Sequence, residues 1–189
     1  MQNDFYSLEE LNSISLKSFG ENVLISRKCS IYSPEKISIG NNVRIDDFCI
    51  LSGEIEIKNY VHISAYSALY GKYGIKIGDF CSISPRCILL SATDNFNGEF
   101  LISPMVPNEY TNIESGEIIL NNYVQICAGC VVMPKVNFRE GSVLGALSFA
   151  KTDLQEWSIY AGIPAKKIKN REKRAKEYGQ QIIDSLHNV

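Results

Sequence analysis

The sequence predicts an all-β fold: a parallel β-helix with one long excursion loop and a C-terminal α-helix. Between residues 39 and 89 a branched aliphatic residue returns at every sixth position, with one two-residue slip. Neither the 3.6-residue period of a helix nor the alternation of an ordinary strand gives this spacing, whereas six residues is a β-helix repeat. The repeating residues are Ile39, Ile45, Leu51, Ile57, Ile63, Leu69, Ile77, Ile83 and Leu89.

The fifth position of each six-residue unit is also small or branched, so each unit is expected to point two side chains inward. Three units form the three strands of a triangular coil, and coils stack at the strand spacing of about 4.8 Å. The core is therefore predicted to be one ladder of side chains on each face. The fifth-position residues are Val43, Cys49, Ile55, Val61, Ser67, Cys81 and Cys87.

The overall composition is that of one ordinary globular domain. The chain has 189 residues, of which 45% are hydrophobic, and a formal net charge of −2. The absence of a basic bias argues against nucleic acid as a partner. No apolar run approaches the length of a membrane span and the N-terminus lacks a signal pattern, so we expect a cytoplasmic protein with no membrane span.

The cysteines are predicted to be buried thiols rather than a disulfide framework. Five of the six occupy the inward fifth position, where a small apolar side chain is needed. No pair of Cys and His has zinc-ligand spacing, so no metal site is predicted. The five are Cys29, Cys49, Cys81, Cys87 and Cys130.

Residues 1–18 are predicted to cap the N-terminal end of the β-helix. Within them, residues 7–15 have Ser7 followed by two glutamates and by apolar Leu8, Leu11 and Ile14, a pattern typical of a short capped helix. A solenoid needs its terminal coil covered, and we expect this helix to cover it.

Regular repeats begin at Phe19, and the β-helix is predicted to span residues 19–157. Three units are irregular: residues 31–38, residues 69–76 and the interruption that begins at Leu89. By the repeat count they are the third, ninth and twelfth units, which places all three on one face. Residues 91–117 are therefore predicted to be a loop that leaves a continuous β-helix, and non-periodic segments of this length are usually functional or disordered.

Residues 158–189 are predicted to form a C-terminal extension and a helix. The charged segment near the end has apolar residues at helical spacing, which suit one stripe of an amphipathic helix. These residues are Ala175, Tyr178, Ile182, Ile183 and Leu186.

The choice of a group for proton transfer near neutral pH is narrow, because the chain has only His62 and His187. His187 is third from the C-terminus, and we expect it on the surface. His62 occupies a corner position beside Tyr66 and Tyr70, which are expected to shape a pocket. Its functional interpretation is a general base, a role that suits imidazole near neutral pH, and the alternative is a solvated outer residue.

The runs VHISAYSALYGKYGIKIGDFCSISPRCILLSATDNFNGEF, VPNEYTN, GCVVMP, VLGALS and IYAGIPAKKI resemble the hexapeptide-repeat acetyltransferases. The resemblance is to bacterial enzymes that O-acetylate sugars of surface polysaccharides and to the galactoside and maltose acetyltransferases. It covers about residues 19–172. It implies a left-handed β-helix, acetyl-CoA as co-substrate without a metal, and a homotrimer with sites between subunits.

One departure from the galactoside and maltose enzymes matters: they carry a catalytic histidine where this chain has Asp94. Because a carboxylate with a pKa near 4 is a weak base, we predict that His62 is the base and that Asp94 or Glu99 orients it or the sugar. The alternatives are that Asp94 itself is the base, or that both carboxylates are solvated loop residues. The predicted acceptor-binding residues are Tyr66, Tyr70, Asp94, Asn95, Glu99 and Tyr110.

The resemblance also implies where CoA binds. Small residues would let the pantetheine arm lie against the β-helix, lysines would meet the phosphates, and Trp157 or Ile163 would flank the adenine. The alternative is that the small residues serve corner geometry and the lysines are solvated. The predicted residues are Ala128, Gly129, Gly145, Ala146, Ser148, Lys151, Ile163, Lys166 and Lys167, with Cys127 narrowing the channel.

The leading functional prediction is an acetyl-CoA-dependent O-acetyltransferase acting on a sugar hydroxyl in lipopolysaccharide, O-antigen or capsule synthesis. The acceptor would attack the thioester directly, because buried cysteines are poor nucleophiles. One alternative is an N-acetyltransferase of a nucleotide-linked amino sugar. Another is a non-catalytic β-helix scaffold that has lost its base.

Overall fold

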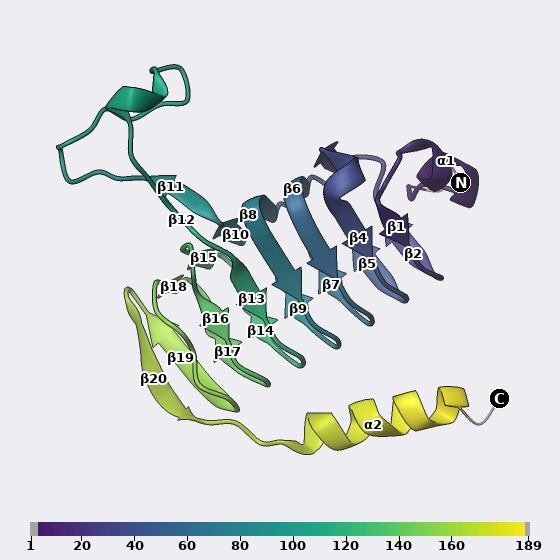
Figure 1. Cartoon of the computed structure of the whole chain (residues 1–189). Helices are drawn as coiled ribbons and strands as arrows, with labels where there is room; N and C mark the ends of the chain where they lie inside the picture. Colours follow the sequence, from purple (N-terminus) through teal and green to yellow (C-terminus); the bar gives the residue numbers. More distant parts are fainter. Residues whose placement is uncertain (1–3, 188–189) are drawn as a thin grey trace.

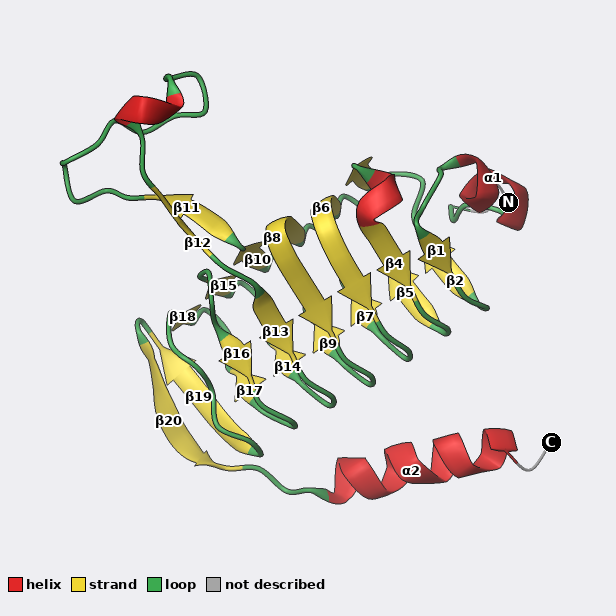
Figure 2. Cartoon of the chain, viewed as in Figure 1, coloured by secondary structure: helices red, strands yellow, loops and turns green. Residues whose placement is uncertain are grey.

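The computed structural model describes residues 4–187, in which short parallel strands stack along one axis (Figure 1). Helices occur only near the two ends of the described chain and in short turns (Figure 2). The predicted all-β fold, a parallel β-helix, is confirmed.

The first face of the prism is an eight-stranded sheet. Its strands are parallel except the last, which returns antiparallel to its neighbour. In spatial order they are β2 (Val23–Ile25), β5 (Val43–Ile45), β7 (His62–Ile63), β9 (Ser82–Ile83), β14 (Gln125–Ile126), β17 (Val143–Leu144), β19 (Ser158–Gly162) and β20 (Ala165–Asn170).

The other two faces form one ten-stranded sheet, because β6 (Ile50–Ile57) and β8 (Ala68–Ile77) run around the corner between them. The second face contains their first halves with β3 (Ser30–Tyr32), β10 (Ile88–Leu90), β15 (Val131–Val132) and β18 (Phe149–Ala150). The third face contains their second halves with β1 (Ser18–Phe19), β4 (Ile37–Ile39), β13 (Ile118–Leu120) and β16 (Asn137–Phe138).

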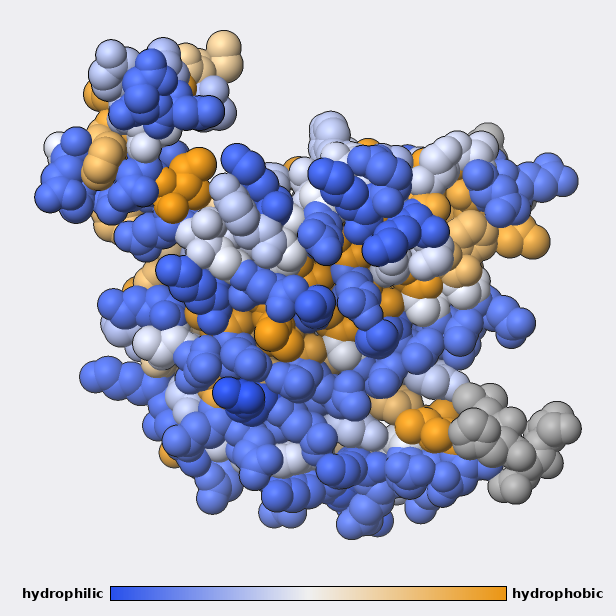
Figure 3. Space-filling view, viewed as in Figure 1, coloured by the Kyte–Doolittle hydropathy of each residue, from blue (hydrophilic) through white to orange (hydrophobic). Residues whose placement is uncertain are grey.

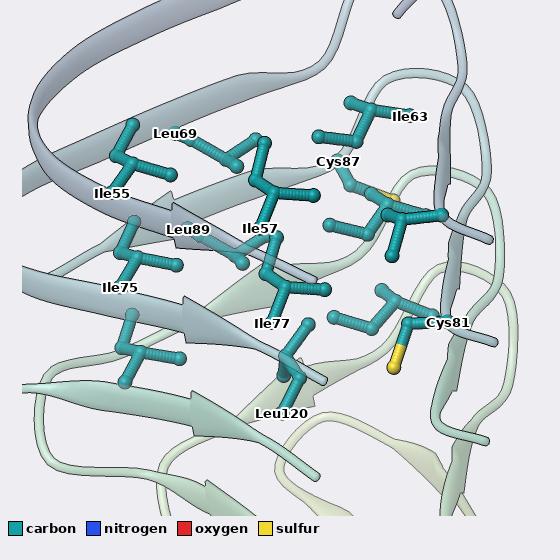
Figure 4. Close-up of a cluster of buried hydrophobic side chains, with 14 of the residues drawn as sticks. Ile55, Ile57, Ile63, Leu69, Ile75, Ile77, Cys81, Cys87, Leu89 and Leu120 are labelled. Carbon is teal, nitrogen blue, oxygen red and sulfur yellow. The ribbon is translucent and has the colours of Figure 1, made fainter. Parts of the chain in front are cut away.

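The inward side chains stack in register from one coil to the next, as the six-residue period predicts. Leu51 pairs with Leu69 and Leu69 with Leu89, and all three are fully buried. Figure 4 shows such residues lying above one another in the interior. Every predicted inward residue, both the repeating aliphatic residues and the fifth-position residues named above, is buried, so burial of these side chains holds the coils together.

The cysteines have the buried positions that the sequence predicts. Cys49, Cys87 and Cys130 lie in one interior column, and each thiol donates to a backbone carbonyl of the following coil, with sulfur–oxygen distances of 3.1 to 3.2 Å. All six cysteines are free. Burial raises the pKa of Cys29 and of Cys81 to about 12, which leaves these thiols unreactive.

The predicted N-terminal helix is α1 (Leu8–Ser13), at the N-terminal end of the stack (Figure 1). The Ser7 hydroxyl accepts from the backbone N–H of Glu10, and the Glu10 carboxylate accepts from that of Ser7. This capping box fixes the start of the helix. Leu11 is buried in the core cluster, so the helix covers the first coil as predicted.

The three irregular units share one side of the prism, as the repeat count predicts, but their extra residues lie not within one face but at the corner between the second and third faces. We call it the insertion corner; it consists of residues 33–36, 53–54, 71–74 and 91–117. Its first part forms the 3-10 helix η1 (Pro34–Lys36). β13 pairs with both β8 and β16, so the coils continue past the longest insertion.

The longest insertion is an ordered excursion that stands away from the coils (Figure 1). It consists of the antiparallel hairpin of β11 (Ala92–Asp94) and β12 (Ile113–Ser115), with the 3-10 helix η2 (Asn108–Tyr110) near its tip. The backbone N–H of Leu101 donates to the Tyr110 carbonyl at 2.9 Å, which closes the tip on itself.

The C-terminal segment adds one more strand to the coils before it leaves them. β19 pairs in parallel with β17, so the stack extends through Gly162, five residues beyond the predicted boundary at residue 157. The chain then forms α2 (Arg174–His187), which runs back along the coils (Figure 1). No helix among residues 4–187 is long and apolar enough to cross a membrane.

The face of α2 that packs differs from the predicted stripe. Gly179 is buried, and a Cβ atom there would lie 2.3 Å from the Tyr123 hydroxyl, so only glycine allows this approach. Of the predicted apolar stripe, Tyr178 and Ile182 are 50% and 41% exposed, whereas Ala175 and Ile183 are partly buried. The side chains of Leu186 and His187 lie outside the described residues.

We predict that Leu69→Ala lowers the free energy of unfolding by about 2–5 kcal/mol, because it leaves a cavity in a stacked ladder. Urea denaturation measures the change. Ile168→Ala on β20, where the side chain is 63% exposed, is the matched control and should cost less than about 0.5 kcal/mol. Equal losses for the two variants would contradict the stacked ladder as the source of stability.

Candidate active site

His62 points outward from the first face because its strand neighbour Ile63 points into the core. Alternation along a strand places the two side chains on opposite sides. Arg44 lies beside His62 in the preceding coil and Ser82 in the following one. The imidazole is 44% exposed, so a substrate can reach it.

The imidazole is held by a carboxylate of the preceding coil. Nε2 of His62 lies 2.8 Å from Oδ2 of Asp46, and the other carboxylate oxygen accepts from Nε of Arg44 at 2.7 Å. Burial alone would raise the pKa of Asp46, but the hydrogen bonds from Arg44 and His62 outweigh it and hold the pKa below its usual range.

An ionised Asp46 determines which nitrogen of His62 carries the proton. Because a carboxylate only accepts hydrogen bonds, Nε2 must be the donor, which leaves the Nδ1 lone pair unprotonated in the neutral ring. Asp46 also stabilises the imidazolium that forms when Nδ1 takes a proton. The Asp46–His62 pair is therefore arranged as an oriented general base.

Within the described protomer the carboxylate that contacts His62 is Asp46, which is not among the residues predicted from the sequence, while Asp94 and Glu99, predicted to orient His62 or the sugar, do not contact His62. The sequence contains a signal for this, because Arg44 and His62 pair across one coil, an offset of 62 − 44 = 18 residues. Asp46, two residues beyond Arg44, is therefore a diagonal neighbour of His62. The six-residue period predicts direct neighbours in adjacent coils but not such diagonal contacts.

Asp94 lies on the excursion, at the end of β11, where it pairs with Ile113 across the hairpin. It lines a cavity of about 260 Å³ between the hairpin and η2. The other residues around this cavity include Lys72, Thr93, Ser103, Asn108 and Thr111, but not His62. The two predicted catalytic residues are thus on different parts of the protomer.

The remaining predicted acceptor residues do not gather around His62. Asn95 and Glu99 both bond to Asn97 within the excursion, at 2.9 and 2.7 Å. Tyr110 is 57% exposed at the end of η2. Tyr66 lies at the corner between the first and second faces, where its ring stacks on Phe48 at 4.9 Å.

Tyr70 lies on the second face, next to the excursion. Its carbonyl accepts from both the backbone N–H and the hydroxyl of Ser91, and its ring is 40% exposed. Tyr66 and Tyr70 therefore belong to different corners and do not line one pocket in the protomer.

A strip of small side chains on the first face leads from His62 toward the C-terminal hairpin. The first four members each follow a strand of that face and donate a backbone N–H to a carbonyl of the next coil, and the fifth lies on β19. The strip is flat because no member is larger than a cysteine, and it is a suitable floor for an extended ligand. It consists of Ser64, Ser84, Cys127, Gly145 and Ala161.

Of the residues predicted to hold CoA, Gly145 belongs to this strip, while Ala128, Gly129 and Ala146 lie at the adjoining corner. A Cβ at Gly129 would lie 2.8 Å from Cδ2 of Leu147, in a left-handed backbone with φ of 72°. Ser148 is buried, and its hydroxyl accepts from the backbone N–H of Gly162 at 2.9 Å. Its structural role is to tie the β19–β20 hairpin to the corner.

The predicted phosphate and adenine residues lie near the end of the strip, with one exception. Lys166 and Lys167 are on β20, and Ile163, 78% exposed, is in the turn that precedes it. Lys167 lines a cavity of about 700 Å³ together with Arg139, Trp157, Arg171 and Lys173. Lys151 follows β18 on the second face, apart from the others.

The comparison with known proteins gives no match among protein-family models. A dTDP-4-amino-4,6-dideoxy-D-glucose acyltransferase from Escherichia coli is 44% identical over 171 residues, which are 89% of this chain and 89% of that protein. The chain belongs to the hexapeptide-repeat sugar acyltransferases.

Two further proteins are similar to this sugar acyltransferase. A crystal structure of AntD, an N-acyltransferase from Bacillus cereus in complex with dTDP and 3-hydroxybutyryl-CoA, is 49% identical with a TM-score of 0.96, and covers 98% of this chain and 100% of its own. WbbJ from Escherichia coli K12, named as a lipopolysaccharide biosynthesis O-acetyl transferase, is 27% identical over 149 residues, 74% of this chain and 71% of its own.

These relatives confirm the enzyme class predicted from the sequence: an acyltransferase that uses acyl-CoA as co-substrate and a sugar as acceptor. They exclude the non-catalytic scaffold. Within residues 4–187, no three His, Cys, Asp or Glu side chains come together as candidate metal ligands.

We predict that Asp46→Asn lowers the free energy of unfolding by about 0.5–1 kcal/mol at pH 7. Since the folded-state pKa of Asp46 lies below its unfolded value near 4, its contribution is present above that value and is lost as the pH falls through the folded pKa. Urea denaturation at pH 7 and near pH 2 measures this. An equal loss at both pH values would contradict the charge-assisted bonds to Arg44 and His62.

Proposed function

We propose that this enzyme transfers an acyl group from acyl-CoA to the amino group of a dTDP-linked 4-amino-4,6-dideoxy sugar. The observation that carries the proposal is the 44% identity to the Escherichia coli acyltransferase named for that acceptor. AntD, crystallised with dTDP-4-amino-4,6-dideoxyglucose and CoA in a variant form, supports it at 48% identity. The proposal ranks the amine above the hydroxyl, the reverse of the order predicted from the sequence.

Two residue positions add support. AntD was crystallised with substitutions S84C, S84A and S84T, and with D94A and D94N. The same residue types stand at the same numbers in this chain, Ser84 on the strip of small side chains and Asp94 on the excursion. We therefore include Ser84 with His62 and Asp94 in the proposed site.

In the proposed reaction a nitrogen–carbon bond replaces the carbon–sulfur bond of the thioester, and one proton moves from the nitrogen to the sulfur. The sugar nitrogen attacks the thioester carbon, the carbon–sulfur bond breaks, and the nitrogen loses a proton as the amide forms. Asp94 accepts a hydrogen bond from the amine and so orients it, while Nδ1 of His62 takes the proton and returns it to the CoA thiolate. The strip from Ser84 to Ala161 supports the pantetheine arm, with its phosphates toward β20.

This mechanism needs His62 and Asp94 from different protomers, because one chain holds them on different parts of its surface. Figure 3 shows the excursion as a lobe apart from the body, with hydrophobic side chains on its outside. Phe96 and Met105 there are 81% and 90% exposed. Exposed apolar groups of this size mark interfaces, and we propose a homotrimer in which each excursion covers the first face of its neighbour.

We predict that dTDP-4-amino-4,6-dideoxyglucose is acylated with a kcat/KM roughly 100-fold or more above that of dTDP-6-deoxyglucose, which has a hydroxyl in place of the amine. A site built to hydrogen-bond an amine discriminates strongly against the analogue with a hydroxyl, because the two groups carry different numbers of protons and so donate different hydrogen bonds. Release of free thiol from acetyl-CoA measures both reactions. Equal or faster release with the hydroxyl compound would contradict N-acylation and support O-acylation.

A further inference from the structure

A second cavity adjoins the one beside Asp94, on its N-terminal side at the insertion corner. Its volume is about 530 Å³, within the range of small-molecule sites. Lys72 lines both cavities, so the two lie next to each other at the corner. We call the second one the lysine cavity; it is lined by Lys17, Ser33, Glu35, Lys36, Ser52, Gly53, Glu54 and Lys72.

The irregular units of the sequence build this cavity. Residues 31–38 form η1, which carries Lys36, and residues 69–76 supply Lys72. The backbone N–H of Lys17 donates to the carbonyls of Pro34 and Ile37, which places Lys17 beside η1. The departures from the six-residue period thus bring three lysines to one cavity.

Gly53 lines the lysine cavity, and no other residue type fits at this position. Its φ is +90°, and a Cβ atom would lie 2.7 Å from the backbone of Gly71 in the next coil. The two glycines allow the coils to approach closely at the point where residues 69–76 carry two residues beyond the six-residue unit.

The three lysines around the cavity have no carboxylate partner within ion-pair distance in the part of the chain that the structure describes. Among the described residues, Lys17, Lys36 and Lys72 form no ion pair, as is also true of several lysines elsewhere, whereas Lys28, Lys58, Lys76 and Lys176 each form one. Glu35 and Glu54 also line the cavity, so its lining has a net charge of 3 − 2 = +1. An anion held there would depend on direct hydrogen bonds from the ammonium groups more than on the summed field.

We propose that the lysine cavity binds the diphosphate of a nucleotide-sugar acceptor while the sugar reaches Asp94 through the adjoining cavity. This inference rests on the proposed function, which supplies a nucleotide-linked sugar. It places the acceptor on the N-terminal coils and acyl-CoA on the C-terminal coils, so the two substrates approach the reacting atoms from opposite ends. Either substrate then binds without blocking the other.

The test is Lys36→Gln, chosen because Lys36 lines the lysine cavity and not the one beside Asp94. The KM for dTDP-4-amino-4,6-dideoxyglucose should rise by roughly tenfold, while kcat and the KM for acetyl-CoA change by less than about twofold. Lys36→Arg should restore most of the affinity. Lys58→Gln, which removes a lysine paired with Glu56 outside the cavity, is the matched control and should leave all three constants unchanged.

Two further measurements separate this inference from the proposed function. Calorimetric titration with dTDP alone should show a roughly tenfold weaker affinity for Lys36→Gln than for the wild-type enzyme. With free 4-amino-4,6-dideoxyglucose, which has no phosphate, the two proteins should react equally fast. Equal melting temperatures establish that the variant is folded.

Each outcome decides one of the two proposals. Unchanged dTDP affinity and unchanged KM in folded Lys36→Gln overturn the lysine cavity as the diphosphate site and leave the proposed function standing. Lys36-dependent binding of dTDP, without acyl transfer to the nucleotide amino sugar, supports the cavity and overturns the proposed acceptor. A wild-type enzyme that neither binds dTDP nor acylates the nucleotide sugar overturns both.

Discussion

The stacking of inward aliphatic side chains is the constraint on which the rest of the structure depends. Residues such as Leu51, Leu69 and Leu89 are buried only if each coil lies in register on the one before it. A slip of one residue would turn every such side chain outward, so the register is strongly determined. Every outward residue then has defined neighbours in the coils above and below.

The candidate site follows from that register. His62 lies beside Arg44 and diagonal to Asp46 because a coil returns after 18 residues, and the resulting hydrogen bonds orient its ring. The strip that begins at Ser64 is straight for the same reason. At the insertion corner, extra residues leave the coils without shifting the stacked core.

Much of this architecture is predictable from the sequence, because burial imposes a period that is visible in the residues themselves. The face of α2 that packs on the coils is not predictable in this way, because it depends on the approach of Gly179 to Tyr123, which is far away in the sequence. The position of His62 follows from the repeat, but its partner Asp46 requires a diagonal contact between coils. The proposed preference for an amine over a hydroxyl has no residue pattern of its own and rests on the relatives.

The central claim is that one site needs His62 of one protomer and Asp94 of another. The most direct measurement is acyl transfer by oligomers co-expressed from His62→Ala and Asp94→Ala chains, compared with each variant alone. Our account predicts that each variant alone is nearly inactive and that the mixture recovers up to roughly one quarter of wild-type activity, from the interfaces that hold both intact residues. A mixture no more active than the separate variants would contradict a site shared between protomers.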